Sequence, residues 1–381
     1  MYSSTKIVFC ANSAWSIQHF RGGVIKTLLA KGAEIHIIAP FDEAMTSFKH
    51  MGCIDHPIKI AARGHNPFQD LLLFWKLYRL YRKIKPDLIF HYTIKPNIYG
   101  SVAAHLAGVP AIAVLTGLGY LFNRRSLVSW VGKQLYRYGL ACSSEVWFLN
   151  EEDKAECISR KLVSAQKCQV LQSEGVDIHF FQPAPFPIHS TSQTFTFLLI
   201  ARLLWDKGIG EYAEAARLLK TSYPQTCCQI IGLIDSSHPN AVGAAQLQDW
   251  QKNSILEYLG THSDVRPAIS AADCIVLPSY REGVPRALLE AAAMERPLIA
   301  TDVPGCREIV EDRVNGFLCE VRNPQDLAVK MEIMMCLPRR SYEQMAYASR
   351  LKVLQLFDEK FIIQRYQAVI DTIKKRKLIK V

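Results

Sequence analysis

The sequence lacks the cysteine spacing of a disulfide-stapled or zinc-binding chain. It contains 11 cysteines in 381 residues, but they are scattered and include no C-x-x-C pair. No signal peptide precedes the first apolar run, "KIVFCA", at residues 6–11. We therefore expect a reduced, cytosolic compartment.

The sequence also lacks an unbroken hydrophobic run of the kind that crosses a membrane. One stretch without Asp, Glu, Lys or Arg covers 24 positions, residues 99–122, which is long enough for a span. Gly108 and Pro110 divide it into a helix of small residues and a β-type run, "AIAVL". We interpret the two parts as a helix and a strand buried in an α/β core.

Acidic charge is scarce in the first half of the chain. Residues 1–185 hold 21 Lys and Arg against 13 Asp and Glu, a net charge of +8. Residues 186–373 hold 19 against 22, a net charge of −3, and the last eight residues add +5. The positive field that attracts anionic partners therefore belongs to the first half and the tail.

Strand and helix patterns alternate along the chain, which is long enough for two domains. In the first half, strands are expected at residues 6–11, 34–40, 86–93 and 110–117. In the second half, one strand is expected to begin at residue 195, and others are expected at residues 228–234, 255–260, 274–279 and 297–301. Such alternation favours parallel sheets covered by helices on both faces. A linker with three prolines, residues 180–194, separates the halves. We predict an α/β protein of two Rossmann-like, doubly wound domains, residues 1–185 and 186–357, that face a cleft.

Two cations follow the first strand of the second half. Arg202 and Lys207 lie in the loop of "ARLLWDKG", and a helix follows. Open α/β sheets bind ligands at the carboxyl ends of their strands, so both cations are expected at the mouth of the cleft. A planar guanidinium and a mobile ammonium together suit a diphosphate. The alternative is a solvated loop with two ordinary surface charges, which this motif alone does not exclude.

Two carboxylates flank the start of a helix in "PSYREGVPRALLEA". Pro285 suits the first turn of that helix, so the backbone N–H groups from Gly283 to Arg286 would be left to bind an anion. Glu282 would meet whatever the anion carries, and Glu290 could accept the vicinal hydroxyls of a ribose. Alternatively, Glu282 caps the helix and Glu290 lies on its surface beside Arg286.

In combination these motifs resemble the retaining glycosyltransferases of family four, which have the GT-B fold. The resemblance rests on R-x4-K, on E-x7-E about seventy residues later, and on "TDVPGCREIVEDRVNGFL", and it covers most of the second domain. It implies that Arg202 and Lys207 hold the diphosphate of a nucleotide sugar and that Glu290 accepts its ribose hydroxyls. The residues it places against the sugar and the distal phosphate are Glu282, Gly283, Val284 and Pro285.

The resemblance also implies catalysis without a metal or other cofactor. No D-x-D pair of the type that binds Mg²⁺ or Mn²⁺ occurs in the sequence. Arg202, Lys207 and a helix N-terminus would neutralise the departing diphosphate, with Glu282 beside the sugar. In this family, attack from the face that the diphosphate leaves is proposed, which retains the configuration. No side chain here is an obvious covalent nucleophile.

The first half resembles a narrower set of bacterial enzymes that extend sugars on undecaprenyl diphosphate, notably transferases that add N-acetylgalactosamine to lipid-linked bacillosamine. Residues 13–40 and 91–122 carry this resemblance. It implies a lipid-linked saccharide acceptor on the first domain, and a loop after the first strand in which Gly22 and Gly23 approach the donor phosphates. It also implies that a C-terminal helix, about residues 358–381, packs on the first domain.

The first half lacks the histidine that many family members place after the "AIAVL" strand. Here that loop begins with Thr116 and Gly117. His19 could supply an imidazole from another loop, although a lone histidine is more often structural. These three residues are therefore the candidates on the acceptor side, and the group that assists the acceptor hydroxyl is left open.

Two segments, residues 66–87 and 123–140, combine basic and apolar side chains in a helical pattern. The first contributes Leu72, Leu73, Trp75 and Leu77 beside Lys76, Arg79, Arg82 and Lys83. This pattern suits a helix on an anionic lipid surface, or an ordinary helix with a core face and a solvated face. Because the first half is basic and the implied acceptor is membrane-anchored, we favour lipid contact. We expect a cytoplasmic protein on the inner face of the plasma membrane.

Three functions are compatible with these patterns. The first is transfer of a hexose or N-acetylhexosamine from a UDP-sugar to a polyprenyl-diphosphate-linked saccharide in cell-surface glycan assembly. The second is a UDP-sugar epimerase of the same architecture, which would need no basic, aromatic membrane face. The third is a non-catalytic binder of sugar nucleotides or nucleic acid. Nucleic acid is not expected as a partner, because the aromatic residues lie among leucines in helical runs rather than on a strand platform.

Overall fold

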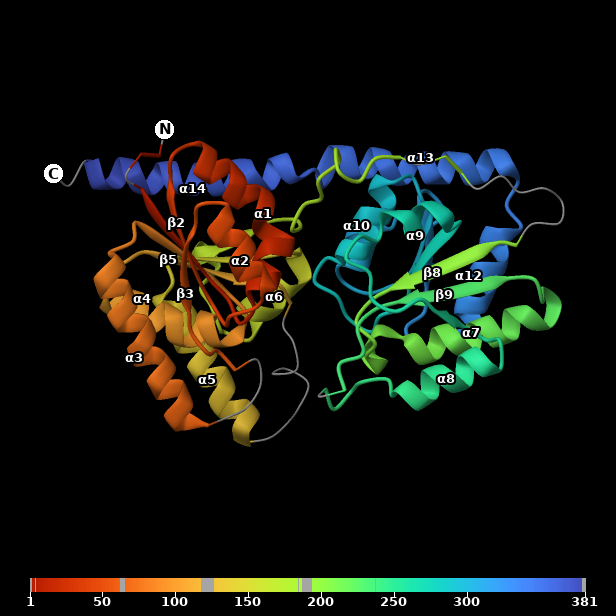
Figure 1. The fold of residues 1–381 in the computed structure, drawn as a ribbon, viewed down its shortest axis with the longest axis horizontal. Coiled ribbons are helices and arrows are strands. Elements are labelled where there is room, and N and C mark those ends of the chain that lie inside the picture. The colour runs from red at the N-terminus through yellow and green to blue at the C-terminus, as the bar shows by residue number, and fades with distance from the viewer. Residues whose placement is uncertain are drawn as a thin grey trace. The chain divides into compact units, whose positions relative to one another are not determined.

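The computed structural model describes residues 2–3, 5–61, 66–117, 127–183, 185–186, 194–236 and 238–378. The chain forms two compact units (Figure 1). Unit 1 contains Met1–Glu174 and Glu359–Val381, and unit 2 contains Gly175–Asp358. The division falls at Gly175 rather than at residue 186, because the segment that follows Gly175 bonds to unit 2. Arg350 Nη1, for example, donates to Phe181 O at 2.9 Å.

Unit 1 is built around a seven-stranded sheet in which the described pairings are parallel. Its strands are β1 (Lys6–Cys10), β2 (Glu34–Ala39), β3 (Ile54–Pro57), β4 (Leu88–Tyr92), β5 (Ala111–Leu115), β6 (Glu145–Phe148) and β7 (Cys168–Val170). The order across the sheet is β3-β2-β1-β4-β5-β6-β7. All residues of β4 and β5 are buried, which explains why β5 is apolar throughout and why β4 contains a single polar residue, His91. The order reverses between β1 and β4, and this is the switch point where such sheets bind ligands.

The helices of unit 1 come from both ends of the chain. They are α1 (Ala14–Ala30), α2 (Glu43–His50), α3 (Pro67–Ile84), the π-helix η1 (Pro96–Gly100), α4 (Ser101–Leu106), α5 (Leu127–Cys142), α6 (Glu151–Ser159), the 3-10 helix η3 (Ala165–Lys167) and α14 (Glu359–Leu378). The C-terminal helix α14 contacts α1. Its Tyr366 is fully buried, and the hydroxyl lies 2.7 Å from that of Tyr92 in β4. The C-terminal helix therefore contributes to the core of unit 1.

Unit 2 has a six-stranded parallel sheet. Its strands are β8 (Thr196–Ile200), β9 (Cys227–Ile231), β10 (Glu257–Tyr258), β11 (Cys274–Leu277), β12 (Leu298–Thr301) and β13 (Gly316–Cys319). Its helices are the 3-10 helix η4 (Trp205–Lys207), α7 (Ile209–Ser222), α8 (Ala244–Lys252), α9 (Arg266–Ala271), α10 (Arg286–Ala293), α11 (Cys306–Ile309), α12 (Pro324–Met335) and α13 (Arg339–Leu356). The order β10-β9-β8-β11-β12-β13 reverses between β8 and β11.

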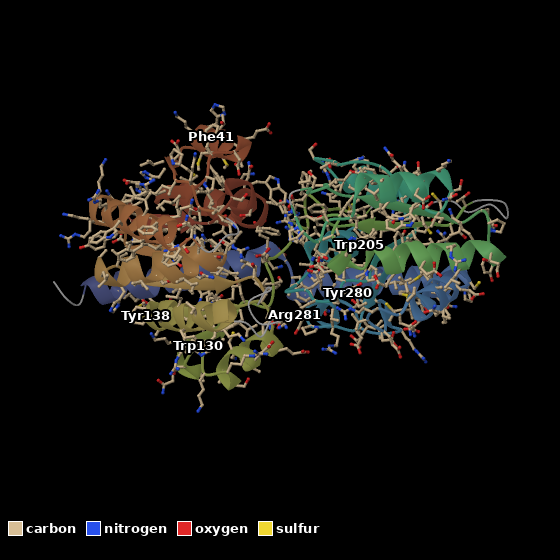
Figure 2. All side chains as sticks on the ribbon, turned by 90° about the horizontal axis from the view of Figure 1, so that it is seen from below. Phe41, Trp130, Tyr138, Trp205, Tyr280 and Arg281 are labelled. Atoms are coloured by element: carbon tan, nitrogen blue, oxygen red, sulfur yellow. The ribbon has the colours of Figure 1, made fainter. Side chains whose placement is uncertain are left out.

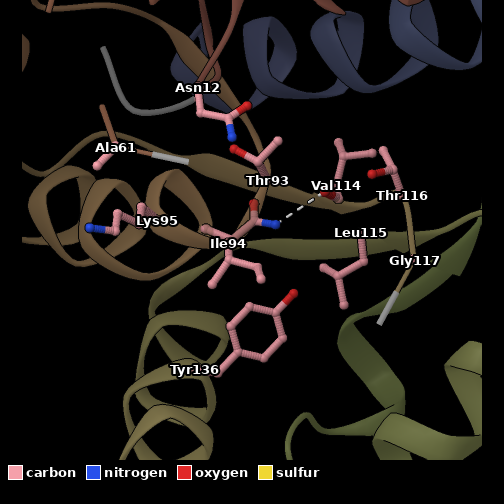
Figure 3. A pocket seen from close by; sticks show the side chains of 11 residues that line it. Asn12, Ala61, Thr93, Ile94, Lys95, Val114, Leu115, Thr116, Gly117 and Tyr136 are labelled. Atoms are coloured by element: carbon pink, nitrogen blue, oxygen red, sulfur yellow. Dashed lines mark hydrogen bonds between the residues drawn. The ribbon is translucent and has the colours of Figure 1, made fainter. Parts of the chain in front are cut away.

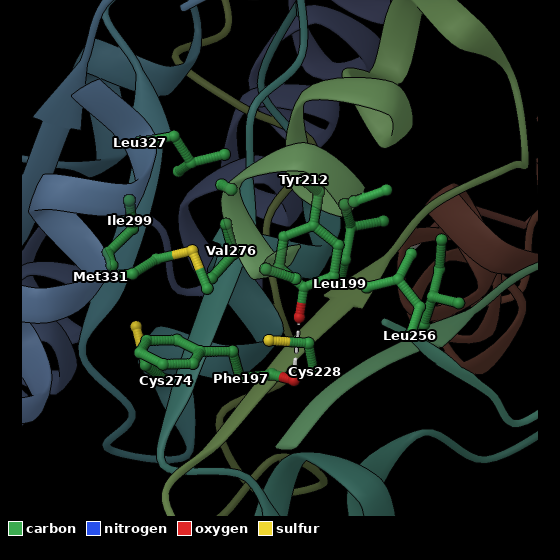
Figure 4. Packing of buried hydrophobic residues seen from close by; sticks show 14 of the residues in the cluster. Phe197, Leu199, Tyr212, Cys228, Leu256, Cys274, Val276, Ile299, Leu327 and Met331 are labelled. Atoms are coloured by element: carbon green, nitrogen blue, oxygen red, sulfur yellow. Dashed lines mark hydrogen bonds between the residues drawn. The ribbon is translucent and has the colours of Figure 1, made fainter. Parts of the chain in front are cut away.

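The core of unit 2 joins its sheet to the helices on one face (Figure 4). Phe197 and Leu199 of β8 pack with Tyr212 of α7 and Met331 of α12. The Tyr212 hydroxyl donates to Phe197 O at 3.0 Å, so this buried polar group is satisfied within the sheet. The apolar side chains of β8 thus fix this strand in the core of unit 2. The loop that follows β8 therefore lies at the carboxyl edge of the sheet.

The predicted fold class is confirmed in each unit: both are doubly wound parallel sheets covered by helices. Strands β3, β6, β7 and β13 are additional to those predicted. The described part of residues 99–122 forms the end of η1, helix α4 and strand β5, as the interruption by Gly108 and Pro110 indicated. Within the described ranges, none of the helices combines the length and the apolar character that a membrane crossing requires.

Candidate functional site

The carboxyl ends of β8 and β11 bring together the charged residues predicted for donor binding. The two strands pair in parallel and lie on either side of the switch point of the sheet. Ligands of open α/β sheets bind at this position. The loop after β8 carries Arg202 and Lys207, and the loop after β11 carries Glu282.

Lys207 and Glu282 form an ion pair between these two loops. Lys207 Nζ lies 2.6 Å from Glu282 Oε1, and the two side chains are 17% and 13% exposed. Ser279 Oγ donates a second hydrogen bond to the same carboxylate oxygen at 2.7 Å. Because the pair is largely shielded from water, its charges act more strongly than they would on an open surface.

Close backbone contact holds the two loops together. Tyr280 N donates to Asp206 O at 2.9 Å. Gly208 has a φ of +71°, and a Cβ at this position would lie 2.0 Å from Pro278 O. A side chain is therefore excluded both by the left-handed backbone and by the neighbouring carbonyl. The ion pair depends on this glycine, because it allows the loops to approach.

Arg202 lies on the same loop but differs from Lys207 in its surroundings. Its side chain is exposed, whereas Lys207 is partly buried. An exposed guanidinium keeps its rotamer freedom and can turn onto a ligand with its planar fork. The structure therefore places both predicted cations at the carboxyl edge of the sheet, one held and one able to reorient.

The loop before α10 has the form predicted for an anion site. Pro285 is the N-cap residue, and its side chain has no acceptor for the first-turn N–H groups. The interpretation of Glu282 as the cap is wrong, because the N-cap residue is Pro285. A Cβ on Gly305 would lie 2.1 Å from Gly283 O, so Gly283 and the buried Val284 are held against the protein. The positive end of the helix dipole at this point favours an anion.

Glu290 lies in the second turn of α10 and is only 4% exposed. Arg286 Nε donates to Glu290 Oε1 at 2.8 Å. Burial raises the pKa of Glu290, and the Arg286 guanidinium acts in the opposite direction. The pairing with Arg286 that the sequence allowed is present, but a surface position for Glu290 is wrong. A carboxylate has about four acceptor positions, and the Arg286 bond uses one of them.

A pocket lies at the corresponding edge of unit 1 (Figure 3). Thr116 and Gly117, two of the predicted acceptor-side residues, line it. Thr93, Asn97 and Tyr136 also line it, and the sequence motifs did not single them out. A signal was present nonetheless, because "TIKPN" is a polar segment directly after a buried strand. The loop after β8 was selected for the same reason, because it follows a buried strand directly.

Gly22, Gly23 and His19 lie in a helix, and their placement in loops is wrong. All three belong to α1, so their N–H groups take part in the helical ladder and are not available to cradle a phosphate. The His19 ring stacks on Trp15 with 4.7 Å between ring centroids. A Cβ on Gly23 would meet the carboxylate of Glu359 in α14, so this glycine lets the two helices approach.

Two family models match the chain in turn. The model described as "Glycosyl transferase 4-like" matches residues 6–150, and the one described as "Glycosyl transferases group 1" matches residues 182–352. An Escherichia coli relative, UDP-Gal:alpha-D-GlcNAc-diphosphoundecaprenol alpha-1,3-galactosyltransferase, is 30% identical over 271 residues, 68% of this chain and 69% of its own. The chain belongs to the glycosyltransferases.

A second relative of this glycosyltransferase aligns over nearly the whole chain. It is the Campylobacter jejuni N,N'-diacetylbacillosaminyl-diphospho-undecaprenol alpha-1,3-N-acetylgalactosaminyltransferase, 28% identical over 388 residues, 97% of this chain and 99% of its own. Its name matches the narrower set of enzymes that residues 13–40 and 91–122 resemble.

Solved structures share the fold of this glycosyltransferase. A Rickettsia africae glycosyltransferase superposes with a TM-score of 0.79 at 20% identity, over 98% of this chain and 100% of the other. Anabaena Alr3699/HepE in complex with UDP superposes with a TM-score of 0.76 at 18% identity, over 97% and 100%. The predicted GT-B fold is thereby confirmed.

Proposed function

We propose that this glycosyltransferase moves a hexose or N-acetylhexosamine from a UDP-sugar to a polyprenyl-diphosphate-linked saccharide in cell-surface glycan assembly. The observation that carries the proposal is the Lys207–Glu282 pair at the switch point of unit 2, beside the start of α10. The names of the relatives from E. coli and C. jejuni each specify a saccharide on undecaprenyl diphosphate as acceptor, and they support the acceptor half.

In this proposal the donor lies along the carboxyl edge of unit 2. Its diphosphate binds Arg202, Lys207 and the first-turn N–H groups of α10, and its ribose hydroxyls donate to Glu290. Lys207 then exchanges its bond to Glu282 for one to a phosphate oxygen. Glu282 is left beside the transferred sugar, together with the backbone of the loop that precedes Pro285.

Catalysis rests on stabilising the leaving diphosphate. As the bond from the sugar to the phosphate breaks, negative charge grows on the phosphate oxygens, next to Lys207, Arg202 and a helix N-terminus. Preorganised charges of this kind supply a large part of many rate enhancements. We propose that these groups act without a metal. We also propose attack from the face that the diphosphate leaves, with retention, which agrees with the alpha-1,3 products named for both relatives.

Transfer should be detected as UDP release that needs both substrates. We expect release when a UDP-sugar and a polyprenyl-diphosphate saccharide are both present, and an unchanged rate when EDTA is added. NMR of the product should show the anomeric configuration of the donor. An inverted product or loss of activity with EDTA would contradict the respective part of the proposal, and no release with any donor and acceptor would contradict the whole. Conversion of the UDP-sugar without acceptor would instead indicate the epimerase.

Unit 1 carries an exposed apolar surface that suits contact with a membrane. On α3 the exposed residues Phe68, Leu71, Leu72 and Trp75 have the spacing of one helical face. The predicted residues Leu73 and Leu77 are instead buried in the core. Trp130 and Tyr138 are exposed on α5 (Figure 2). We propose that these side chains, with the exposed basic residues of α3, bind the cytoplasmic leaflet.

Removing this apolar face should weaken binding to vesicles. We expect Leu71→Glu combined with Trp75→Glu to lower the affinity for phosphatidylglycerol vesicles at least tenfold, because half-burying each side chain contributes roughly 1 kcal/mol or more. Flotation of the full chain with vesicles measures the effect. Tyr347→Glu is the matched control, because Tyr347 is equally exposed but lies on unit 2. Equal flotation of the double variant and the control would contradict membrane contact through α3.

A further inference from the structure

The pocket in unit 1 has the size and position of a site for part of one sugar. Its volume is about 190 Å³, well above the ~10–15 Å³ that one water needs and below the roughly 300 Å³ or more of pockets that hold drug-sized ligands. Its lining follows β1, β4 and β5, on both sides of the switch point of this sheet. The cavity is therefore larger than a water site and lies where this fold binds ligands.

Thr93 combines a strained backbone with an unused polar group in this pocket. It is the first residue after β4, and its φ is +67°. β-branched residues rarely adopt this left-handed conformation. Its hydroxyl is shielded from solvent and has no hydrogen-bond partner among the described residues. Strain and an unmet hydrogen bond at one residue are typical of a binding site.

Asn97 places a second unused polar atom in the pocket. Its side chain is 1% exposed, and Nδ2 donates to Val114 O at 3.1 Å (Figure 3). A carbonyl can only accept, so this bond decides which end of the amide is Oδ1. The Tyr136 side chain also hydrogen-bonds Asn97. Asn97 Oδ1 itself has no partner within the part of the chain that the structure describes. The pocket thus contains two oxygens without a hydrogen-bond partner among the described residues, the Thr93 hydroxyl and Asn97 Oδ1.

The segment that forms this pocket is bonded to the helix with the exposed apolar face. Lys95 Nζ lies 2.6 Å from Asp70 Oδ1 on α3, and the Tyr99 hydroxyl donates to Asp70 Oδ2 at 2.8 Å. These bonds connect the loop after β4 to α3. A ligand that is itself attached to a lipid can therefore occupy the pocket while its lipid stays near α3.

We propose that this pocket binds the N-acetyl group of the acceptor sugar, a proposal that rests on the function proposed above. The N–H of the acetamido group donates to Asn97 Oδ1, and its carbonyl accepts from the Thr93 hydroxyl. Its methyl group packs on the apolar part of the lining, which includes Ala61, Ile94 and Leu115. The acceptors named for both relatives carry N-acetyl groups.

Thr93→Val tests the proposal, because it removes the hydroxyl and keeps the shape. Transfer is measured to polyprenyl diphosphate N-acetylglucosamine and to its glucose counterpart, which has a hydroxyl in place of the acetamido group. We expect the wild-type protein to prefer the first acceptor. The variant should lose roughly two- to tenfold in kcat/KM with that acceptor, the worth of one hydrogen bond, and little with the second. The donor KM should not change.

Thr27→Val is the matched control, because Thr27 is also partly buried in unit 1 but lies in α1 outside the pocket. Since the Thr93 hydroxyl has no partner to lose, Thr93→Val should melt no lower than wild type. Equal transfer by the wild-type protein to both acceptors, or equal losses by Thr93→Val with both, would overturn the proposal. Absence of transfer by the wild-type protein would instead contradict the proposed function.

A binding measurement tests the assignment of the pocket without requiring transfer activity. It therefore distinguishes a failure of this proposal from a failure of the proposed function. In saturation-transfer NMR with N-acetylglucosamine 1-phosphate, the acetyl methyl should receive the strongest signal from the wild-type protein, and Thr93→Val should reduce it. A signal centred on the ring protons, or one that Thr93→Val leaves unchanged, would overturn the assignment of the pocket.

Discussion

Lys207→Ala is expected to lower kcat by roughly 10²- to 10³-fold, which is the usual cost of removing one preorganised group that stabilises developing charge. Lys207 is held 2.6 Å from Glu282 at the edge where the leaving diphosphate is proposed to lie. Steady-state kinetics at saturating donor and acceptor measures kcat, and calorimetric titration with UDP measures donor affinity separately. A loss in kcat larger than the loss in UDP affinity would show that Lys207 acts mainly in the transition state.

Two further variants make the Lys207 result interpretable. Lys207→Arg keeps the charge but not the compact geometry of an ammonium, so it should recover only part of the activity. Lys252→Ala removes an exposed lysine of α8 and should leave kcat unchanged. If Lys207→Ala kept more than about a tenth of wild-type kcat while folded, the proposed role of Lys207 would be wrong.

Arg21→Met is expected to destabilise unit 1 by about 3–5 kcal/mol, because it leaves a buried carboxylate without its partner. Arg21 Nη2 lies 3.1 Å from Glu174 Oε1, and the side chains are 1% and 6% exposed. The Arg21 guanidinium also lies over the Tyr92 and Tyr366 rings, at 5.1 and 5.9 Å. At about 2–4 °C per kcal/mol for a unit of this size, the melting transition of unit 1 should fall by about 6–20 °C in calorimetry.

The matched control for Arg21 is an exposed ion pair. Arg217→Ala removes the partner of Glu214 on the surface of α7, and such pairs contribute about 0–1 kcal/mol. Adding Glu174→Gln to Arg21→Met should recover part of the stability, since the unpaired charge is then absent. A shift for Arg21→Met no larger than that for Arg217→Ala would mean that the buried pair contributes little.

The helix boundaries of the first half illustrate where the resemblance misleads. It places Gly22 and Gly23 in a loop, yet α1 runs through both, although glycine weakens helices. The helix is held by tertiary contacts: buried Ile17, Val24 and Leu28 pack into unit 1, and α14, from the far end of the chain, lies against it. Such long-range packing outweighs propensity and leaves no mark within the segment itself.

The candidate sites also contain residues that the sequence predicted and residues whose importance only the structure showed. Arg202, Lys207 and Glu282 were predictable because each follows an apolar strand, and the carboxyl ends of strands in a parallel sheet meet at one edge. Thr93 and Asn97 also follow an apolar strand, but residue type did not show what sets them apart, which is a positive φ at Thr93 and, within the described part of the chain, an oxygen without a hydrogen-bond partner on each. Neither is a property of residue type.

The sequence by itself determined the two parallel sheets and the charged groups that lie at the carboxyl edge of the sheet in unit 2, since burial and strand direction follow from the pattern of apolar runs. Only the tertiary structure decided that Lys207 pairs with Glu282 across 75 residues, that Glu290 is buried, and that a pocket opens in unit 1. These depend on how closely loops from different strands approach one another. That distance is set by contacts such as that of Gly208 with Pro278 O, which are remote in sequence.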